Sequence, residues 1–195
     1  MCVTMAQEHP HIINTLEFCA GFSMSLYSCA ESESIEPMKS FLNKLFTFLL
    51  SYANAVRYRI CHYLTMLLNS IGDHAVIDDN LCDQITSRMI DRSMDKSLEV
   101  RAQAVFASHR LQEPSNDQCP IIEMYLFHLY KDTKPEVRRA VLATMSENQK
   151  TLLAALKKTR DIDDSMRKMA YEFISKITCQ SLCKQSLITN MATIL

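Results

Sequence analysis

The sequence predicts an all-α fold in which antiparallel helical hairpins stack into a solenoid, and three observations support this prediction. A short polar turn followed by an apolar residue and an arginine occurs four times. The 195 residues include only two glycines and five prolines, too few for the many turns of an all-β chain. Apolar residues then recur at intervals of four after each turn, which is the spacing of one buried helical stripe.

The turn motif defines a repeat. Its first residue lies five positions before an apolar anchor and is aspartate in three of the four copies, and the next residue after the anchor is always arginine. The four arginines are 44, 37 and 29 residues apart. The first two intervals are close to the HEAT period. We therefore expect a HEAT-type right-handed helical-hairpin solenoid whose repeats have diverged in length. The four copies are Ser51 with Val56-Arg57, Asp95 with Val100-Arg101, Asp132 with Val137-Arg138, and Asp161 with Met166-Arg167.

The helices follow in order along the chain. Residues 1–36 are expected to form an N-terminal helix, from Pro10 to Ser28, and a polar loop. Residues 178–195 are expected to form a partial terminal helix. Residues 37–177 are expected to form four HEAT-like hairpins, which pair helices 37–50 with 54–70, 78–93 with 97–111, 118–131 with 135–146, and 148–159 with 163–177.

Residues that favour the first turn of a helix occur at several of the expected helix starts. Pro135 occupies a first helical position, where its missing N–H costs no hydrogen bond. Asn54, Ser97 and Ser165 lie near the equivalent starts and are expected to cap exposed amides.

The motif arginine lies beside the buried stripe of its helix. Its stem can pack there while the guanidinium reaches the turn aspartate of the same or the adjoining repeat. The alternative, direct contact of these arginines with a ligand, is less favoured because a paired, buried guanidinium is not free to bind. The residues of this expected structural ladder are Arg57, Asp95, Arg101, Asp132, Arg138, Asp161 and Arg167.

The cysteines are scattered through helical patterns, and no apolar secretory segment occurs in residues 1–11. Buried free thiols in a reducing compartment are therefore expected. Cys179 and Cys183 share a helical face, but zinc would need two further ligands that the sequence does not supply at ligand spacing. No metal or other cofactor is expected. The eight are Cys2, Cys19, Cys29, Cys61, Cys82, Cys119, Cys179 and Cys183.

Nothing in the sequence indicates catalysis. The histidines form no H-E-x-x-H pattern, and there is neither a G-x-S-x-G elbow nor a glycine-rich phosphate loop. The acidic pairs Asp78-Asp79 and Asp163-Asp164 lie at expected helix starts, where the helix dipole favours negative charge. We expect no enzyme and no small-molecule substrate. No apolar run reaches the length of a membrane span, so no membrane contact is expected either.

The net charge of −1 conceals an asymmetry. Residues 1–87 hold four Lys/Arg and nine Asp/Glu, which gives −5, while residues 88–176 hold sixteen and thirteen, which gives +3. Stacked repeats would bring the surplus cations together along one edge. A phosphate-binding strip needs only such spaced cations, and a solvated face balanced by neighbouring acids is the alternative. The expected DNA-binding residues are Arg139, Lys157, Lys158, Arg160 and Lys168.

Several blocks, in this order, resemble the N-terminal region of the family of HEAT-repeat, non-SMC subunits of condensin I. The resemblance spans about residues 40–177, and its most specific blocks are Pro135–Leu142 and Arg167–Tyr171. The other blocks are Phe41–Arg59, Ile77–Asp79, Val100–Val105, Arg110–Pro114 and Cys119-Pro120.

The resemblance implies a non-enzymatic scaffold that acts in mitotic chromosome condensation. It implies the kleisin and SMC subunits of condensin as partners, and double-stranded DNA bound by its backbone without sequence preference. It also implies a location in the nucleus and on mitotic chromosomes, as well as in the cytoplasm. A generic protein–protein interaction solenoid without DNA contact remains the alternative, and salt-dependent DNA binding separates the two.

Overall fold

The computed structural model describes residues 10–28, 35–71 and 78–192. Regular structure in these ranges is helical throughout, which confirms the predicted all-α class. A single 3₁₀ turn, His109–Leu111, follows α5. The helices are α1 (Pro10–Ser28), α2 (Ile35–Phe48), α3 (Asn54–Asn69), α4 (Asp79–Ser93), α5 (Leu98–Ala107), α6 (Pro120–Lys131), α7 (Pro135–Thr144), α8 (Gln149–Lys158) and α9 (Asp164–Ala192).

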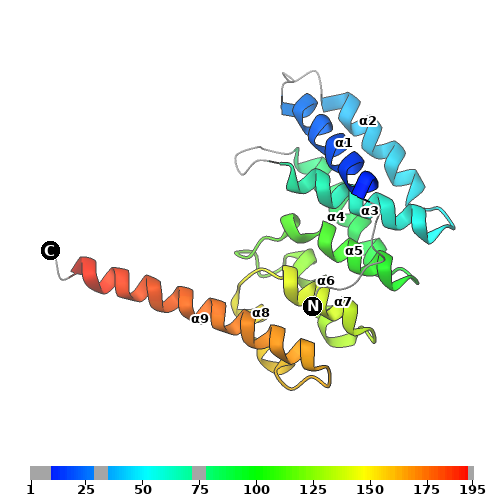
Figure 1. Cartoon of the computed structure of the whole chain (residues 1–195). Coiled ribbons are helices and arrows are strands. Elements are labelled where there is room, and N and C mark those ends of the chain that lie inside the picture. The colour runs from blue at the N-terminus through cyan, green and yellow to red at the C-terminus, as the bar shows by residue number, and fades with distance from the viewer. Residues whose placement is uncertain (1–9, 29–34, 72–77, 193–195) are drawn as a thin grey trace.

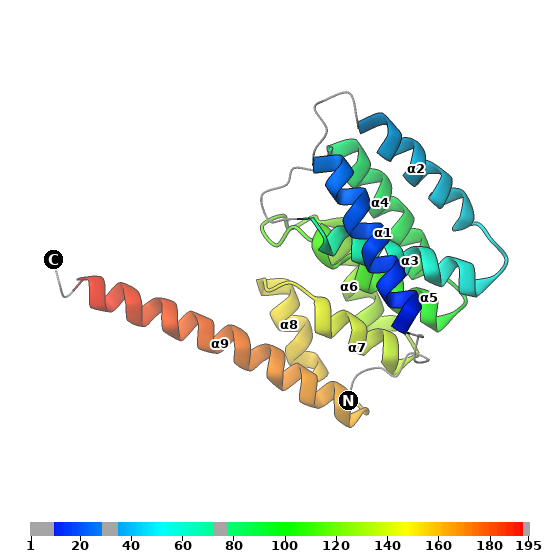
Figure 2. The same ribbon diagram turned by 45° about the horizontal axis from the view of Figure 1, so that its top comes forward.

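The hairpins stack in two rows to form the HEAT-type solenoid. Helices α3, α5, α7 and α9 form one row, in which each helix packs against the next, and α4, α6 and α8 pack in a second row beside it. The first helix, α1, packs against α3 and α2, at one end of the stack (Figures 1 and 2). The four short turns within the hairpins therefore follow one another along one edge of the molecule, which we call the turn edge.

Helix α5 joins the two halves of the interior. Its residues Val100, Ala104 and Ala107 belong to a core formed with α1 to α4. Its residues Ala102 and Val105 belong to a second core formed with α6 to α9. All five are at most 1 % exposed. A helix that is covered on both sides needs small residues, because neighbouring backbones must approach closely.

The anchor residue of the motif is buried in three copies and exposed in the first. Val100, Val137 and Met166 are 0 % exposed, whereas Val56 is 36 % exposed. Val100 belongs to the first core, and Val137 and Met166 belong to the second. Val56 belongs to neither core, and α1 contacts α3 farther along, where the Ser23 and Tyr63 hydroxyls are 2.9 Å apart.

The last helix is longer than expected. Sequence analysis divides residues 163–195 into a hairpin helix and a separate terminal helix, but α9 runs without a break from Asp164 to Ala192. No glycine or proline lies between these residues, so nothing interrupts the backbone hydrogen bonds. Figure 1 shows the distal part of α9 extending away from the stacked hairpins.

Two of the expected helix caps are wrong. The Ser97 side chain makes no cap bond to α5, and α3 begins after Ala53 with no side-chain cap. The acids expected at helix starts do bond there: Asp78 accepts from the Leu81 amide at 3.1 Å and Asp163 from the Met166 amide at 3.0 Å. Carboxylates accept these amide bonds more strongly than hydroxyls because they are charged.

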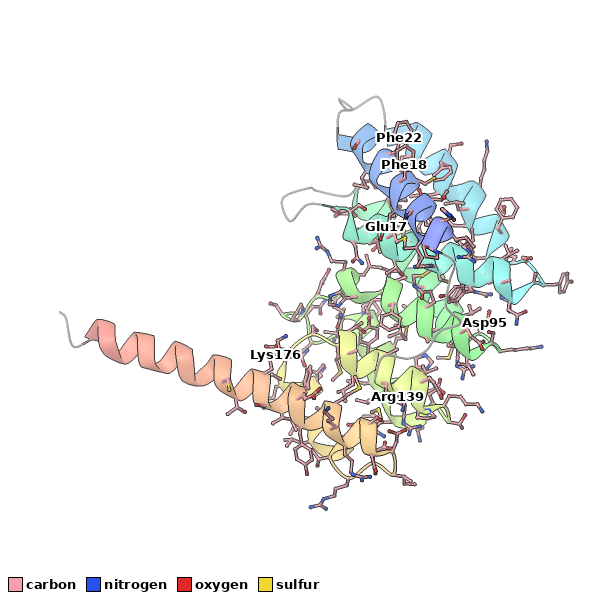
Figure 3. The ribbon with its side chains drawn as sticks, viewed as in Figure 1. Glu17, Phe18, Phe22, Asp95, Arg139 and Lys176 are labelled. Carbon is pink, nitrogen blue, oxygen red and sulfur yellow. The ribbon has the colours of Figure 1, made fainter. Side chains whose placement is uncertain are left out.

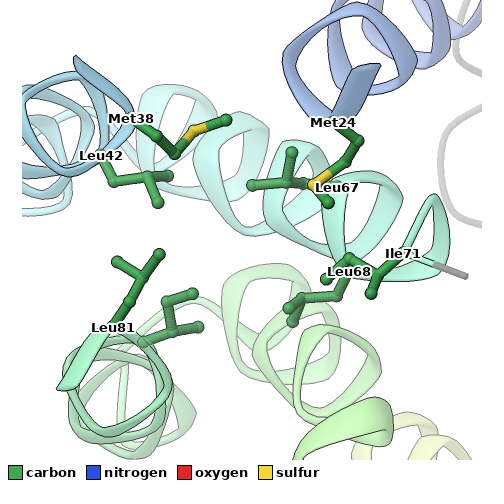
Figure 4. A pocket seen from close by; sticks show the side chains of 8 residues that line it. Met24, Met38, Leu42, Leu67, Leu68, Ile71 and Leu81 are labelled. Atoms are coloured by element: carbon green, nitrogen blue, oxygen red, sulfur yellow. The ribbon is translucent and has the colours of Figure 1, made fainter. Parts of the chain in front are cut away.

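Helices α1, α2, α3 and α4 together line a small hollow, shown in Figure 4. Its volume is about 20 Å³, close to the size of one water molecule, and its lining is apolar. An apolar hollow of this size stays dry and holds no ligand. The lining residues are Met24, Met38, Leu42, Leu67, Leu68, Ile71, Leu81 and Ile85.

Candidate functional site

The turn edge is organised by arginine–aspartate pairs that cross from one repeat to the next. Arg57 in α3 donates to Asp95 in the following turn through Nε at 2.7 Å and Nη2 at 2.8 Å. Arg101 in α5 repeats the arrangement with Asp132, at 3.0 and 3.2 Å. Such two-point bonds fix both the distance and the orientation of the partners.

The third pair follows the same direction, and each arginine also binds its own turn. Arg138 in α7 donates to Asp161 at 3.1 Å. Through Nη1, Arg57 donates to the Ser51 carbonyl at 2.6 Å and Arg101 to the Asp95 carbonyl at 2.9 Å. One guanidinium therefore holds two successive turns at a fixed separation.

The turn aspartate has a local function as well. Its carboxylate accepts from the backbone amide two residues on, at 3.0 Å from Ser97 and 2.9 Å from Lys134. In the first copy the Ser51 hydroxyl accepts the equivalent bond from Ala53 at 3.2 Å. The sequence contains no arginine before Arg57. Serine therefore suffices at position 51, because only the local bond is required there.

The fourth arginine ends the series. Arg167 in α9 donates to the carbonyl of Asp161 at 2.9 Å, as its equivalents do in their turns. Its Nη2 contacts Asp164, an exposed residue of the same helix, rather than an aspartate of another turn. Within the described ranges, three of the four motif arginines thus bridge repeats and Arg167 does not.

The buried carboxylates of the ladder stay ionised. Burial alone would raise the pKa of Asp95, Asp132 and Asp161. Burial is the largest single influence, but the arginine's hydrogen bond and charge and the backbone amide bond together outweigh it, so the pKa of Asp95 and of Asp132 falls below its usual value. For Asp161 the bonds from the Asp163 amide and Lys158 have the same result.

A histidine adds to the second rung. His128 is 2 % exposed, and its Nδ1 lies 3.3 Å from the Asp132 carboxylate. Burial is the largest influence on its pKa and lowers it, although Asp132 acts in the opposite direction. His128 is therefore neutral at pH 7 and belongs to the packing of the ladder.

Two of the five expected DNA-binding residues are held by acids. Arg139 donates to Asp163 at 2.9 Å, and Lys158 donates to Asp161 at 3.0 Å. Lys168 lies 3.8 Å from Glu172, and both side chains are mostly exposed. Figure 3 shows Arg139 on the same side of the molecule as Asp95.

The other two expected residues are Lys157 and Arg160, and Lys157 lies near an aromatic ring that sequence reasoning missed. Lys157 is exposed and lies 5.5 Å from the centre of the Tyr130 ring. Lys158 lies 6.0 Å from the same centre. Arg160 is exposed in the adjoining turn, and no acid contacts it or Lys157 within the described ranges. The signal was an aromatic residue directly before the third turn.

Two further cations extend this group. Lys131, next to Tyr130, and Lys134, in the third turn, are exposed and have no acidic partner among the described residues. We call Tyr130, Lys131, Lys134, Lys157 and Arg160 the basic cluster. It places four exposed cations around two successive turns.

The described cysteines are unpaired. Cys61 and Cys119 are buried, as expected, but Cys19 and Cys179 are exposed. Burial raises the pKa of the Cys61 thiol to about 12. Cys2, Cys29 and the Cys183 side chain lie outside the described residues, so the relation of Cys179 to Cys183 is not described.

The described residues meet the requirements of neither a metal site nor a membrane-spanning helix. In the described part of the chain, no three His, Cys, Asp or Glu side chains are grouped so that they could hold a metal ion. No described helix combines the length and the apolar character that a membrane crossing needs.

The chain is similar to condensin complex subunit 3 of several organisms. Identity is 39 % over 175 residues with the Homo sapiens protein and 36 % over 176 residues with the Xenopus laevis protein, which covers 87 % of this chain in each case. The matched part is 17 % of each relative, so the chain spans about a sixth of their length. No protein-family model matches the chain.

A solved structure matches as well. The crystal structure of the Schizosaccharomyces pombe condensin Cnd3–Cnd2 subcomplex aligns with a TM-score of 0.67 and 29 % identity. The alignment covers 86 % of this chain and 21 % of the matched one.

Proposed function

Because this chain is a HEAT-repeat relative of condensin complex subunit 3, we propose that it is a non-enzymatic scaffold of a condensin-type assembly that binds DNA. The collinear sequence similarity and the shared solenoid support the scaffold role. A stack of helical hairpins offers an extended surface to partners and requires no catalytic group. The function that we propose is part of mitotic chromosome condensation, in the nucleus and on chromosomes.

The proposed protein partners are the kleisin and SMC subunits of condensin. The support is that the S. pombe relative was crystallised as a Cnd3–Cnd2 subcomplex. The relatives extend far beyond the matched segment. Recovery of SMC subunits with this chain from mitotic cells would support the assignment, and their absence would contradict it.

The basic cluster carries the DNA-binding part of the proposal. Its four cations, Lys131, Lys134, Lys157 and Arg160, are exposed and have no acidic partner in the described ranges. Lysine and arginine spaced along a surface bind phosphates without reading bases. Lys168 is mostly exposed and is proposed as an additional contact.

Arg139 and Lys158 have a different place in the proposal. Both side chains are less than 20 % exposed, and acids in the fourth turn hold them. Because these acids neutralise them, we expect Arg139 and Lys158 to bond phosphate only where an aspartate releases them. Removal of their charge would also disturb the fold, so they are poor choices for a binding test.

The test is the binding of two unrelated duplexes to the wild type and to the double variant Lys157→Glu/Arg160→Glu. Wild type should bind both duplexes alike. The variant should bind more weakly, with a log–log salt slope that is less negative by about 0.9 for each lost contact. The matched control, Lys44→Glu/Arg88→Glu, makes the same charge change at exposed sites on α2 and α4.

The outcome also decides between the two functions. If the wild type binds neither duplex at low salt, or if the control loses as much affinity as the test variant, the basic cluster is solvated surface. The generic interaction solenoid without DNA contact is then the better description.

A further inference from the structure

A cleft opens on the turn edge between the first and second turns. Its volume is about 350 Å³, which is enough for one or two side chains of a partner. The basic cluster lies at the third and fourth turns and contributes no residue to the cleft. The lining residues are Ser51, Tyr52, Arg57, Asp91, Arg92, Met94, Asp95 and Lys96.

The floor of the cleft is rigid. Arg57 and Asp95, two of its lining residues, form the first rung of the ladder and neutralise each other. Arg57 also bonds the Ser51 and Tyr52 carbonyls at 2.6 and 3.0 Å. A site whose walls are already fixed loses little conformational entropy when a partner binds.

The rim of the cleft is apolar. Tyr52 is fully exposed, and Met94 is 54 % exposed. Leu50, next to the first turn, is 72 % exposed. Tyrosine and methionine are enriched at protein interfaces, because both supply adaptable apolar area.

Arg92 and Lys96 are two cations of the cleft whose N–H groups are not all bonded to described residues. Arg92 bonds the Leu49 carbonyl at 3.0 Å and Asp95 at 3.3 Å, both through Nη1. Its Nε and Nη2 have no partner among the described residues. Lys96 is exposed, and no acid pairs with it in the same ranges. These donors suit a single carboxylate, which an arginine fork can bind at two points.

The electrostatics favour a protein segment over a nucleic acid. Three cations (Arg57, Arg92, Lys96) and two carboxylates (Asp91, Asp95) line the cleft, so its charge is +1. One carboxylate is attracted by the surplus cation, whereas a polyanion would meet the two carboxylates of the lining and an apolar rim.

We propose that this cleft binds a short segment of a partner protein in which an acidic residue adjoins a large apolar side chain. The carboxylate binds Arg92 and Lys96, and the apolar side chain packs between Tyr52 and Met94. The cleft shares no residue with the basic cluster. A failure of DNA binding would therefore not contradict this proposal.

The test uses a displayed library of random twelve-residue peptides, selected on the wild type and counter-selected on the triple variant Tyr52→Ser/Met94→Ser/Lys96→Glu. Enriched peptides should combine an acidic residue with a neighbouring aromatic or aliphatic one. By fluorescence anisotropy, Lys96→Glu and Met94→Ser should each weaken binding about tenfold, the size expected at an interface hot spot.

Matched controls make the result specific. Ile162 occupies the position of Tyr52 in the fourth turn and is 97 % exposed. Ile162→Ser and Lys44→Glu should leave peptide affinity unchanged. The proposal is overturned if no peptide is enriched, if enriched peptides lack acids, or if they bind the triple variant equally well. Displacement of the peptide by a 20-base-pair duplex would instead assign the cleft to nucleic acid and also overturn the proposal.

Discussion

Asp95, Asp132 and Asp161 each serve two repeats. Each carboxylate closes its own turn through a backbone amide and also accepts from the arginine of the preceding repeat. Serine at position 51 provides only the local bond. The preference for aspartate in three of the four copies thus follows from charge, since a hydroxyl could close the turn but could not neutralise a guanidinium.

We predict that Asp132→Ala lowers the free energy of unfolding by about 1–3 kcal/mol, because Arg101 and His128 lose a buried acceptor. Urea unfolding followed by circular dichroism measures this loss. Asp164→Ala, at an exposed pair, should change it far less. An unchanged midpoint for Asp132→Ala would contradict a stabilising role for the ladder.

The stability that Asp132 contributes should depend on pH. The pKa of Asp132 is lower in the folded chain than its usual value. The stability that this carboxylate contributes is therefore present above about pH 4 and is lost as the pH falls through the folded-state pKa. The difference between wild type and Asp132→Ala should shrink in that acidic range.

The thiols should differ in reactivity. Cys61 is buried and its pKa is raised to about 12, so almost none of it is thiolate at pH 8. Cys179 and Cys19 are exposed. We predict that iodoacetamide modifies Cys19 and Cys179 in the native protein well before Cys61. Peptide mass spectrometry over time measures the order, and equal rates for all three would contradict the described burial.

At the scale of elements, the repeat pattern predicted nearly every helix within a few residues. It succeeded because each turn motif ends one helix and starts the next. It did not predict α9 as one helix, because a weak apolar pattern after residue 177 resembled a new element although the sequence holds no breaker there. The expected Ser97 cap was wrong because the Ser97 hydroxyl donates to the Glu99 carboxylate instead.

The packing of α5 on both sides makes it sensitive to larger side chains. Ala104 is 0 % exposed and lies in a helix that is packed against both α3 and α7. Ala104→Leu should cost about 1–3 kcal/mol, because added methylenes force neighbouring helices apart. Ala143→Leu on the exposed side of α7 is the control. Equal urea midpoints for the two variants would show that the α5 contact is loosely packed.

At the scale of the whole molecule, the two cores are joined by α5 and by Leu111, which packs against both. In a stacked array, inner repeats are stabilised from both sides and outer ones from one. Backbone amides of α5 should therefore exchange with deuterium more slowly than those of α1 and α8. Peptide-resolved exchange by mass spectrometry tests this order, and a protected α1 would contradict it.

The candidate site was predictable only in part. The sequence motif indicated which arginines and aspartates lie on the turn edge, because helical spacing places them there. It could not show that Asp163 holds Arg139 or that Tyr130 lies under Lys157, since those pairs are brought together by stacking of separate hairpins. The cleft at Tyr52 also arises from the meeting of two turns and has no linear signature.

The arginine–aspartate pairs give the molecule two edges of unequal stiffness. Consecutive turns are tied by charged, two-point bonds, so their spacing resists elongation. On the opposite edge, the repeats are linked by hydrogen bonds to backbone groups, such as Gln112 to the Thr144 carbonyl at 2.8 Å and Arg110 to the Ile71 carbonyl at 3.2 Å. When the solenoid bends, the pitch should change on that side and stay nearly constant along the turns. A ligand that contacts several turns would then meet the same spacing of charges whatever the curvature.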